Sequence, residues 1–223
     1  MNTKDLAKYI DHTNVKPTVT VKDIIKLCHE AKQYNFHSVC VTPVYVKLAK
    51  SLLKNSGVKV VTVIGFPHGS ETSLAKVVAT REAIKNGADE IDMVINDGAL
   101  LSGDYQLVKK EMALVKKAAG RHNTKVILET GYLTSAQIKK ACLLARQAKL
   151  DFVKTATGYG LRGATIADIK LIRKTVGPKM GVKASGGIKD ASTAWAMIKA
   201  GATRIGTSAG VAIVMGKKSK ANY

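Results

Sequence analysis

Short β-branched runs alternate along this sequence with longer segments whose apolar residues recur at helical spacing, and this alternation narrows the fold more than any other feature. Parallel strands joined by crossover helices show this pattern. Eight runs are predicted as strands, at residues 9–13, 38–42, 59–65, 90–96, 125–130, 152–157, 181–186 and 204–208. Helical segments are predicted between them, for example at residues 21–34, 74–85, 104–119, 135–147, 166–175 and 191–199.

The number and spacing of the strands indicate a single (β/α)8 barrel domain that spans residues 1–223. Eight units in 223 residues leave about 28 residues for each, close to the size expected of a compact barrel unit. A doubly wound open sheet is the competing architecture, but eight consecutive units without an irregular connection favour the barrel. No Pro/Ser-rich linker divides the chain, and we expect residues 216–223 to form a flexible tail.

Composition and cysteine usage place the chain in a broad class. Hydrophobic residues make up 46% and aromatic residues 5%, which fits an aliphatic globular core. The N-terminal residues lack the apolar region of a secretory signal, and the longest uncharged apolar stretch is too short for a membrane span. Cys28, Cys40 and Cys142 are odd in number and far apart, so they form no disulfide framework. We therefore expect a cytoplasmic protein that does not act at a membrane.

The net charge of +20 favours anionic partners without saying which kind. Lysine pairs such as Lys109-Lys110 fall on predicted helices and face water, and no basic-aromatic interleaving is present. The sequence thus indicates no specific nucleic-acid partner. It does not determine the oligomeric state, although it is compatible with a homodimer.

The sequence lacks a complete motif for binding a dinucleotide, a nucleotide phosphate or a metal. Gly158, Gly160 and Gly163 match a dinucleotide-binding fingerprint, but the acidic residue expected about twenty residues further on is missing. There is no phosphate-binding Walker sequence, and the five histidines form no metal-binding pair. We expect neither a cofactor nor a metal.

Three predicted strands carry a charged residue where a strand buried on both faces should be apolar. These residues are Asp92, Lys154 and Lys183, in the fourth, sixth and seventh strands. If their faces point into the barrel, two ammonium groups and a carboxylate meet in a poorly solvated space. A buried structural ion pair is the alternative for any one of them, but three together favour a catalytic group.

Two close lysines point to a specific chemistry. Burial and a neighbouring positive charge both lower a lysine pKa, so one of the two can be a neutral amine at pH 7. A neutral amine attacks a carbonyl and forms a Schiff base, which lets the adjacent carbon lose a proton or a carbon–carbon bond break. Asp92 could then move protons. Spacing does not settle which lysine is the nucleophile.

Further polar residues stand near strand ends, where barrel enzymes place their sites. Asp11, Cys40, Glu129 and Thr155 qualify by position. For Asp11 and Glu129, a brace that holds neighbouring side chains is as good an interpretation as substrate contact. Cys40 is better interpreted as a pocket wall than as a nucleophile, because no local pattern places a histidine beside it.

Glycine-containing loops suggest a phosphate site. Ser185-Gly186-Gly187 follows the seventh strand, and residues 206–210, which include Ser208, follow the eighth. Glycines let backbone N–H groups approach an anion, and the loops after strands seven and eight are the usual phosphate location in a barrel. Ordinary turn chemistry explains either loop equally well when it is taken alone.

Nine ordered sequence blocks resemble the motifs of deoxyribose-phosphate aldolases. They are YIDHT, SVCVTP, VIGFPHG, EIDMVINDGAL, VILETGYL, DFVKTATGYG, GATIADI, VKASGGI and RIGTSAG, and they cover nearly the whole chain. The resemblance implies a (β/α)8 enzyme that reversibly cleaves 2-deoxy-D-ribose 5-phosphate to D-glyceraldehyde 3-phosphate and acetaldehyde without a cofactor. It implies that Lys154 forms the Schiff base, that Lys183 tunes its protonation and that Asp92 takes part in proton transfer.

The resemblance also implies which residues bind the phosphate, and it leaves some positions open. Phosphate contacts fall on Gly158, Gly186, Gly187 and Ser208. A supporting role is implied for the terminal Tyr223, because the terminal tyrosine of the family can reach the site. Asp11, Cys40 and Thr155 are supporting candidates by their positions alone. The chain departs from the family at Asn14, Thr42 and Ala156, which puts aldehyde preference in doubt. Another Schiff-base aldolase or transaldolase, and a basic nucleic-acid-binding protein, are the rival functions.

Overall fold

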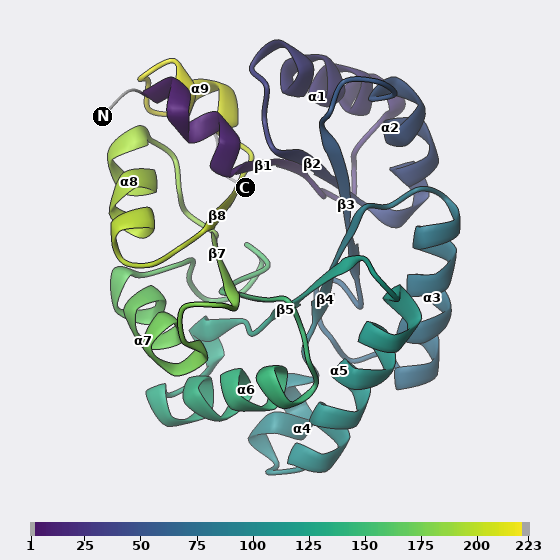
Figure 1. Cartoon of the computed structure of the whole chain (residues 1–223), viewed down its shortest axis with the longest axis vertical. Helices are drawn as coiled ribbons and strands as arrows, with labels where there is room; N and C mark the ends of the chain where they lie inside the picture. Colours follow the sequence, from purple (N-terminus) through teal and green to yellow (C-terminus); the bar gives the residue numbers. More distant parts are fainter. Residues whose placement is uncertain (1–2, 220–223) are drawn as a thin grey trace.

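The computed structural model describes residues 3–219 and shows eight strands closed into a barrel with helices around it (Figure 1). Each strand pairs in parallel with the next, and β8 pairs with β1. The strands are β1 Ile10–Asn14, β2 Ser38–Val41, β3 Lys59–Ile64, β4 Glu90–Val94, β5 Asn123–Ile127, β6 Phe152–Lys154, β7 Gly181–Ser185 and β8 Arg204–Thr207. The closed order confirms the predicted (β/α)8 barrel and excludes the open sheet.

The six predicted helices are all present, with bounds that differ by no more than one residue. The α-helices are α1 Val21–Gln33, α2 Val46–Leu52, α3 Ser73–Lys85, α4 Asp97–Leu101, α5 Tyr105–Ala119, α6 Ser135–Gln147, α7 Ile166–Val176, α8 Ala191–Lys199 and α9 Gly210–Val214. Three 3-10 helices, η1 Thr3–Tyr9, η2 Pro43–Tyr45 and η3 Thr130–Tyr132, were not predicted, nor were α2, α4 and α9. Short elements like these carry too few turns to show a helical period.

The sequence marks where the longer helices begin. Thr20 starts α1 and Thr134 starts α6, each with a capping box in which the threonine hydroxyl accepts a bond from the backbone three residues on. Gly87 and Gly201 follow α3 and α8 with φ of 103° and 118°, a conformation that favours glycine. Each glycine therefore ends its helix in a turn that leads into the next strand, β4 or β8.

The main core lies between the sheet and the helices, and the barrel interior differs from it. The outward strand faces carry aliphatic residues such as Val39, Ile91 and Val153, all fully buried. Inside the barrel, next to β2 and β3, lies a separate apolar cluster of Val15, Cys40, Val61 and Val63. The remaining inward positions are mostly polar or charged, which is unusual for a packed barrel and locates the site. Within residues 3–219, no helix combines the length and apolar character that a membrane crossing needs.

Two strands, β5 and β6, end three residues earlier than predicted, more than any other strand. β6 ends at Lys154 rather than at Thr157. Glu129, predicted inside the fifth strand, lies beyond β5 in the left-handed conformation, with φ of 48°. Both changes occur at the C-terminal ends of strands, which we call the mouth of the barrel.

Candidate active site

Asp92, Lys154 and Lys183 meet inside the barrel, as the sequence predicts. Lys154 of β6 is the register partner of Lys183 of β7, and Asp92 comes from β4 across the interior. Asp92 Oδ2 lies 3.1 Å from Lys154 Nζ and 2.8 Å from Lys183 Nζ. Asp92 and Lys183 are completely buried, and Lys154 is 4% exposed. Asp92 therefore bridges the two amines in a space nearly closed to water.

Four more charged residues complete this cluster, and three of them, Lys125, Glu90 and Arg204, were not predicted as site residues from the sequence. Lys125 Nζ lies 2.8 Å from Asp92 Oδ1 and 2.6 Å from Glu90 Oε2. Arg204 Nη1 lies 3.1 Å from Glu90 Oε2 and 2.9 Å from Asp11 Oδ1. Lys125, Glu90 and Arg204 stand at or near the starts of their strands, where a charge is usually solvated, but their side chains point inward.

Asp11 lies in the middle of this cluster. β1 continues to Asn14, so Asp11 is its second residue and not its end. Asp11 Oδ2 is 2.5 Å from Lys183 Nζ, and its Oδ1 accepts a bond from Ser38 Oγ at 2.6 Å. Its contacts hold Lys183 and Arg204 in place, which is the bracing arrangement considered for it from the sequence.

The charges in the barrel do not balance. Among the described residues, the cluster contains the cations Lys125, Lys154, Lys183 and Arg204 and the carboxylates Asp11, Glu90 and Asp92. The half-exposed Lys59 adds a positive charge from outside, 3.7 Å from Glu90 Oε1. A buried surplus charge is costly, and releasing a proton from one lysine removes it.

The surroundings determine which lysine releases the proton. Burial lowers the pKa of Lys154, and the charge of Lys183 adds to this, while Asp92 alone opposes it as a carboxylate. Burial would lower the pKa of Lys183 as well, but Asp11 and Asp92 together hold it above its ordinary value. The pKa of Asp92 stays well below its ordinary value, because Lys125, Lys183 and Lys154 outweigh the effect of its burial. Lys154 is thus the amine that burial and charge favour in the neutral form.

Cys40 and Thr155 lie beside the charged cluster and form no ion pair with it among the described residues. Cys40 is completely buried against Val61 and Val63, and burial raises the pKa of its thiol. Thr155 Oγ1 donates to Ser185 O and accepts from Ser185 N, both at 3.0 Å, so it ties the end of β6 to β7. Cys40 is placed as a wall of the interior and Thr155 as an inter-strand clamp.

Three of the four predicted phosphate residues gather around one small cavity. Gly186, Gly187 and Ser208 line it together with Gly206 and Thr207, and its volume is about 20 Å³. Gly186 and Gly187 have φ of 89° and 76°, so their conformation favours glycine. Gly158 does not line this cavity and lies in the loop after β6, with φ of 96°.

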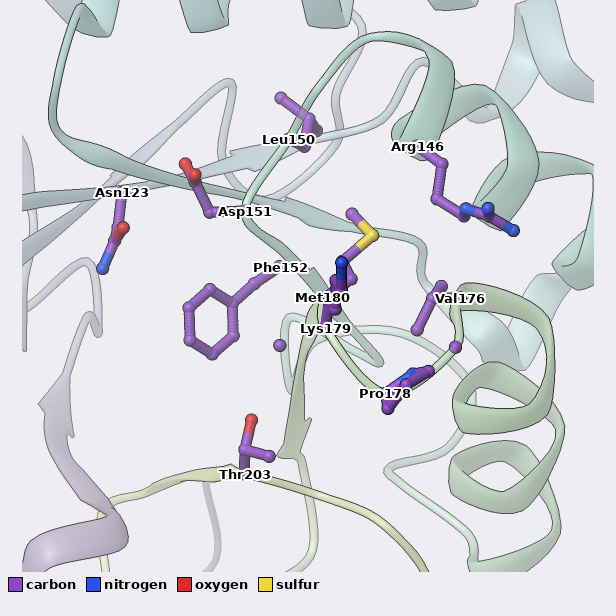
Figure 2. A pocket seen from close by; sticks show the side chains of 12 residues that line it. Asn123, Arg146, Leu150, Asp151, Phe152, Val176, Pro178, Lys179, Met180 and Thr203 are labelled. Atoms are coloured by element: carbon purple, nitrogen blue, oxygen red, sulfur yellow. The ribbon is translucent and has the colours of Figure 1, made fainter.

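A larger cavity lies at the other end of the barrel. It has a volume of about 760 Å³ and is lined by residues at the starts of β5, β6 and β7, among them Asn123, Phe152 and Gly181 (Figure 2). None of the predicted site residues lines it. The Phe152 ring separates it from the charged cluster, with its centroid 5.6 Å from Lys125 Nζ and 5.3 Å from the Arg204 guanidinium carbon. It is therefore not part of the site described above.

The end of the chain is described only as far as residue 219. Ser219 N donates to Lys189 O at 3.0 Å, next to the Gly186-Gly187 turn. Tyr223, for which a role at the site is expected, lies outside the described residues.

Comparisons with known proteins show which family the chain belongs to. Residues 6–216 match the model of a family described as DeoC/LacD family aldolase. The chain is 57% identical over 219 residues to a deoxyribose-phosphate aldolase of Thermococcus gammatolerans, covering 96% of this chain and 97% of the relative. A solved structure described as QR15, an aldolase, superposes with a TM-score of 0.92 at 42% identity, covering 95% of both chains. A tetrameric deoxyribose phosphate aldolase from Aeropyrum pernix superposes with a TM-score of 0.87 at 34% identity, covering 96% of this chain and 91% of that one.

Proposed function

The chain belongs to the DeoC/LacD family of aldolases, and on this basis we propose which reaction its barrel carries out and with which residues. The enzyme is a deoxyribose-phosphate aldolase. It cleaves 2-deoxy-D-ribose 5-phosphate reversibly to D-glyceraldehyde 3-phosphate and acetaldehyde through a lysine Schiff base. The family match over residues 6–216 and the 57% identity over 96% of the chain support this activity.

Lys154 is the proposed nucleophile, and the charge surplus in the barrel is the observation that carries this assignment. Four cations face three carboxylates, and Lys154 has a single carboxylate neighbour while Lys183 has two. The neutral Nζ of Lys154 attacks C1 of the open-chain sugar, and loss of water gives the iminium. Its slight exposure, 4%, leaves it as the amine of this pair that a substrate entering from the mouth can reach.

Cleavage follows from the electron demand of the iminium. The bond between C2 and C3 breaks, because the iminium at C1 can accept electrons only from the adjacent carbon. The C3 hydroxyl gives its proton to the Asp92 carboxylate, directly or through a water molecule, as D-glyceraldehyde 3-phosphate leaves, and the electrons of the C2–C3 bond form an enamine on Lys154. Protonation at C2 and hydrolysis of the imine then release acetaldehyde and the free amine.

The proposed roles of Lys183 and Asp92 follow from their ion pairs. Lys183 carries the ammonium charge that helps to keep Lys154 neutral, and during turnover it donates and recovers a proton through Asp92. Asp92 Oδ2 lies within 3.1 Å of both amines, so it orients Lys154 and connects it to Lys183. With its low pKa, Asp92 remains a carboxylate, and protons pass along it rather than resting on it.

The phosphate is proposed to bind at Gly186, Gly187 and Ser208, with Gly158 from the neighbouring loop. The positive φ values of the three glycines let backbone N–H groups approach an anion without a side chain in the way. The net charge of +20 assists capture of a phosphorylated sugar, and salt screens this effect.

Trapping with borohydride tests the assignment. The protein is incubated with 2-deoxy-D-ribose 5-phosphate, reduced, digested and mapped by mass spectrometry. We expect a two-carbon adduct on the peptide that contains Lys154. An adduct on the Lys183 peptide would reverse the roles of the two lysines. In a parallel incubation with a dihydroxyacetone-based substrate, an adduct formed there but not with 2-deoxy-D-ribose 5-phosphate would favour a different aldolase.

Location and assembly are further proposals. We place the enzyme in the cytoplasm, since Cys28, Cys40 and Cys142 are all free thiols buried in the structure. A homodimer is proposed as the assembly, and the Aeropyrum pernix enzyme, described as a tetramer, shows that a similar barrel can associate. Sedimentation at several protein concentrations tests this.

A further inference from the structure

The loop after β6, residues 155–163, is folded around the side chain of Glu129, a residue that the reaction above does not use. Glu129 Oε2 accepts a hydrogen bond from Thr157 N at 3.0 Å and another from Thr157 Oγ1. Thr157 Oγ1 in turn accepts from Tyr159 N at 3.0 Å. The carboxylate thereby fixes the backbone on both sides of Gly158, at residues 157 and 159.

The same loop has room for Glu129 only because of a glycine. A Cβ atom on Gly160 would lie 2.5 Å from Glu129 Cδ and 2.6 Å from its Oε1. The loop backbone therefore lies directly against the carboxylate, and Glu129 Oε1 is buried there without a hydrogen-bond partner. The glycine spacing of GYGLRG, which resembles a dinucleotide fingerprint, is here explained by this packing.

The far end of the loop reaches the second group of proposed phosphate residues. A Cβ on Gly163 would lie 2.3 Å from Gly186 O, and Ala164 N donates to Ser185 O and Gly186 O, both at 3.1 Å. One loop thus connects Glu129 at the end of β5 with the Gly186 turn at the end of β7. Its shape sets the relative position of Gly158 and Gly186.

Glu129 holds this arrangement at a cost to stability. Its backbone lies in the left-handed region, with φ of 48° and ψ of 60°, which is unfavourable for a residue with a side chain. Its side chain is 2% exposed, and one oxygen has no partner, which is also unfavourable. Asp97 and Arg162 are the charged groups that face it, of opposite sign. Such features persist where a defined geometry is needed.

We propose that Glu129 is a positioning residue that shapes loop 155–163 so that Gly158 and Gly186 meet the substrate phosphate together. The proposal rests on the proposed function, because it assigns the loop to the phosphate of that substrate. Glu129 acts through Thr157, and no step of the reaction proposed above is assigned to it. It therefore contributes to the preference for a phosphorylated sugar and not to Schiff-base formation.

The test compares 2-deoxy-D-ribose 5-phosphate with 2-deoxy-D-ribose in the same variants. For Glu129→Gln we expect the ratio of kcat/KM for the two sugars to fall about tenfold, because two charge-assisted hydrogen bonds lose their charge. Borohydride trapping with acetaldehyde should be unchanged. Glu111→Gln is the matched control, since Glu111 is also 2% exposed but lies on α5, bonded to Lys76. The control should leave the ratio at the wild-type value.

A second pair of variants decides the question if Glu129→Gln fails to fold. Thr157→Val removes the hydroxyl that bonds Glu129 and should lower the ratio, whereas Thr157→Ser keeps the hydroxyl and should restore it. Equal losses with both sugars, or a ratio unchanged in Glu129→Gln and Thr157→Val, would overturn the proposal. A wild-type enzyme that cleaves neither sugar would instead refute the proposed function.

Discussion

Buried lysines meet buried carboxylates in two regions of this molecule, and the two regions differ in their charge balance. Between α3 and α5, Lys76 pairs with Glu111 at 2.7 Å and also donates to Gly69 O and Val94 O at 2.7 and 3.0 Å. In the barrel, four cations share three carboxylates. The first region is a satisfied structural pair, while the second contains one positive charge too many. This surplus, rather than burial as such, distinguishes a reactive lysine from a structural one.

A third cluster contains a surplus of negative rather than positive charge, and it too shifts the pKa of one of its members. Asp97 and Glu129 lie near each other at the mouth, and burial together with the charge of Glu129 raises the pKa of Asp97 to about 7, with Lys76 opposing. Each of the two unbalanced clusters thus shifts the pKa of one member toward the neutral form.

The largest effect is expected when the surplus lysine itself is replaced. Lys154→Met keeps the length of the side chain but removes the nucleophile, so we expect kcat to fall by at least ~10⁴-fold, since covalent catalysis has no substitute here. Steady-state kinetics with 2-deoxy-D-ribose 5-phosphate measures this. A variant that retains a tenth of the wild-type rate would show that Lys154 is not the reacting amine.

Replacing the structural lysine should change stability and not chemistry. Lys76→Met leaves Glu111 buried without its partner, and we expect a loss of about 3–5 kcal/mol in the free energy of unfolding. Urea denaturation gives this value, and the pH dependence of kcat in the folded variant should match the wild type. A shifted pH profile would mean that the two regions are not separate.

Replacing the charged neighbour of Lys154 should move its protonation. In Lys183→Met the surplus disappears while Asp92 remains, so the pKa of Lys154 should rise and a neutral amine should form only at higher pH. We expect turnover at pH 7 to fall ~10²-fold, because an acid–base step is lost as well, with the profile of kcat/KM displaced to alkaline pH. Loss of turnover with no displacement of the profile would contradict the charge argument.

The smallest expected effect concerns the acidic cluster. The pKa of Asp97 in the folded protein, about 7, exceeds the ordinary value of 3.8, so its contribution to stability is complete below pH 3.8 and is lost as pH rises toward 7. Asp97→Asn removes this dependence. We expect the free energy of unfolding of the variant to exceed that of the wild type by about 2 kcal/mol at pH 8 and by a smaller amount at pH 5. The value at pH 8 takes into account that Asp97 is partly exposed to solvent. Equal stability differences at both pH values would show that Asp97 has an ordinary pKa.

The parts of this molecule that the sequence predicts are those that depend on short-range periodicity. The strands and long helices follow from alternating apolar positions, and Asp92, Lys154 and Lys183 stand out because each breaks an apolar strand. Glu90, Lys125 and Arg204 break the same rule, but they lie where their strands begin, and only the barrel register shows that they face inward.

Other features depend on contacts between distant residues. The left-handed backbone of Glu129 arises from its fit to Thr157 and Gly160, about thirty residues further on, and no local pattern indicates it. The different pKa shifts of Lys154 and Lys183 arise from Asp11, which pairs only with the latter across the closed barrel. Spacing along the chain carries no information on either point.

The pKa of Lys154 is the most direct test of the account. Lysine side chains labelled with ¹³C at the ε position can be followed by NMR across a pH titration, and the signal absent from Lys154→Met identifies Lys154. We predict that this signal titrates below 10.5, the ordinary lysine value, while the signal absent from Lys183→Met does not titrate below it. A Lys154 signal that titrates at 10.5 or above would contradict the central claim.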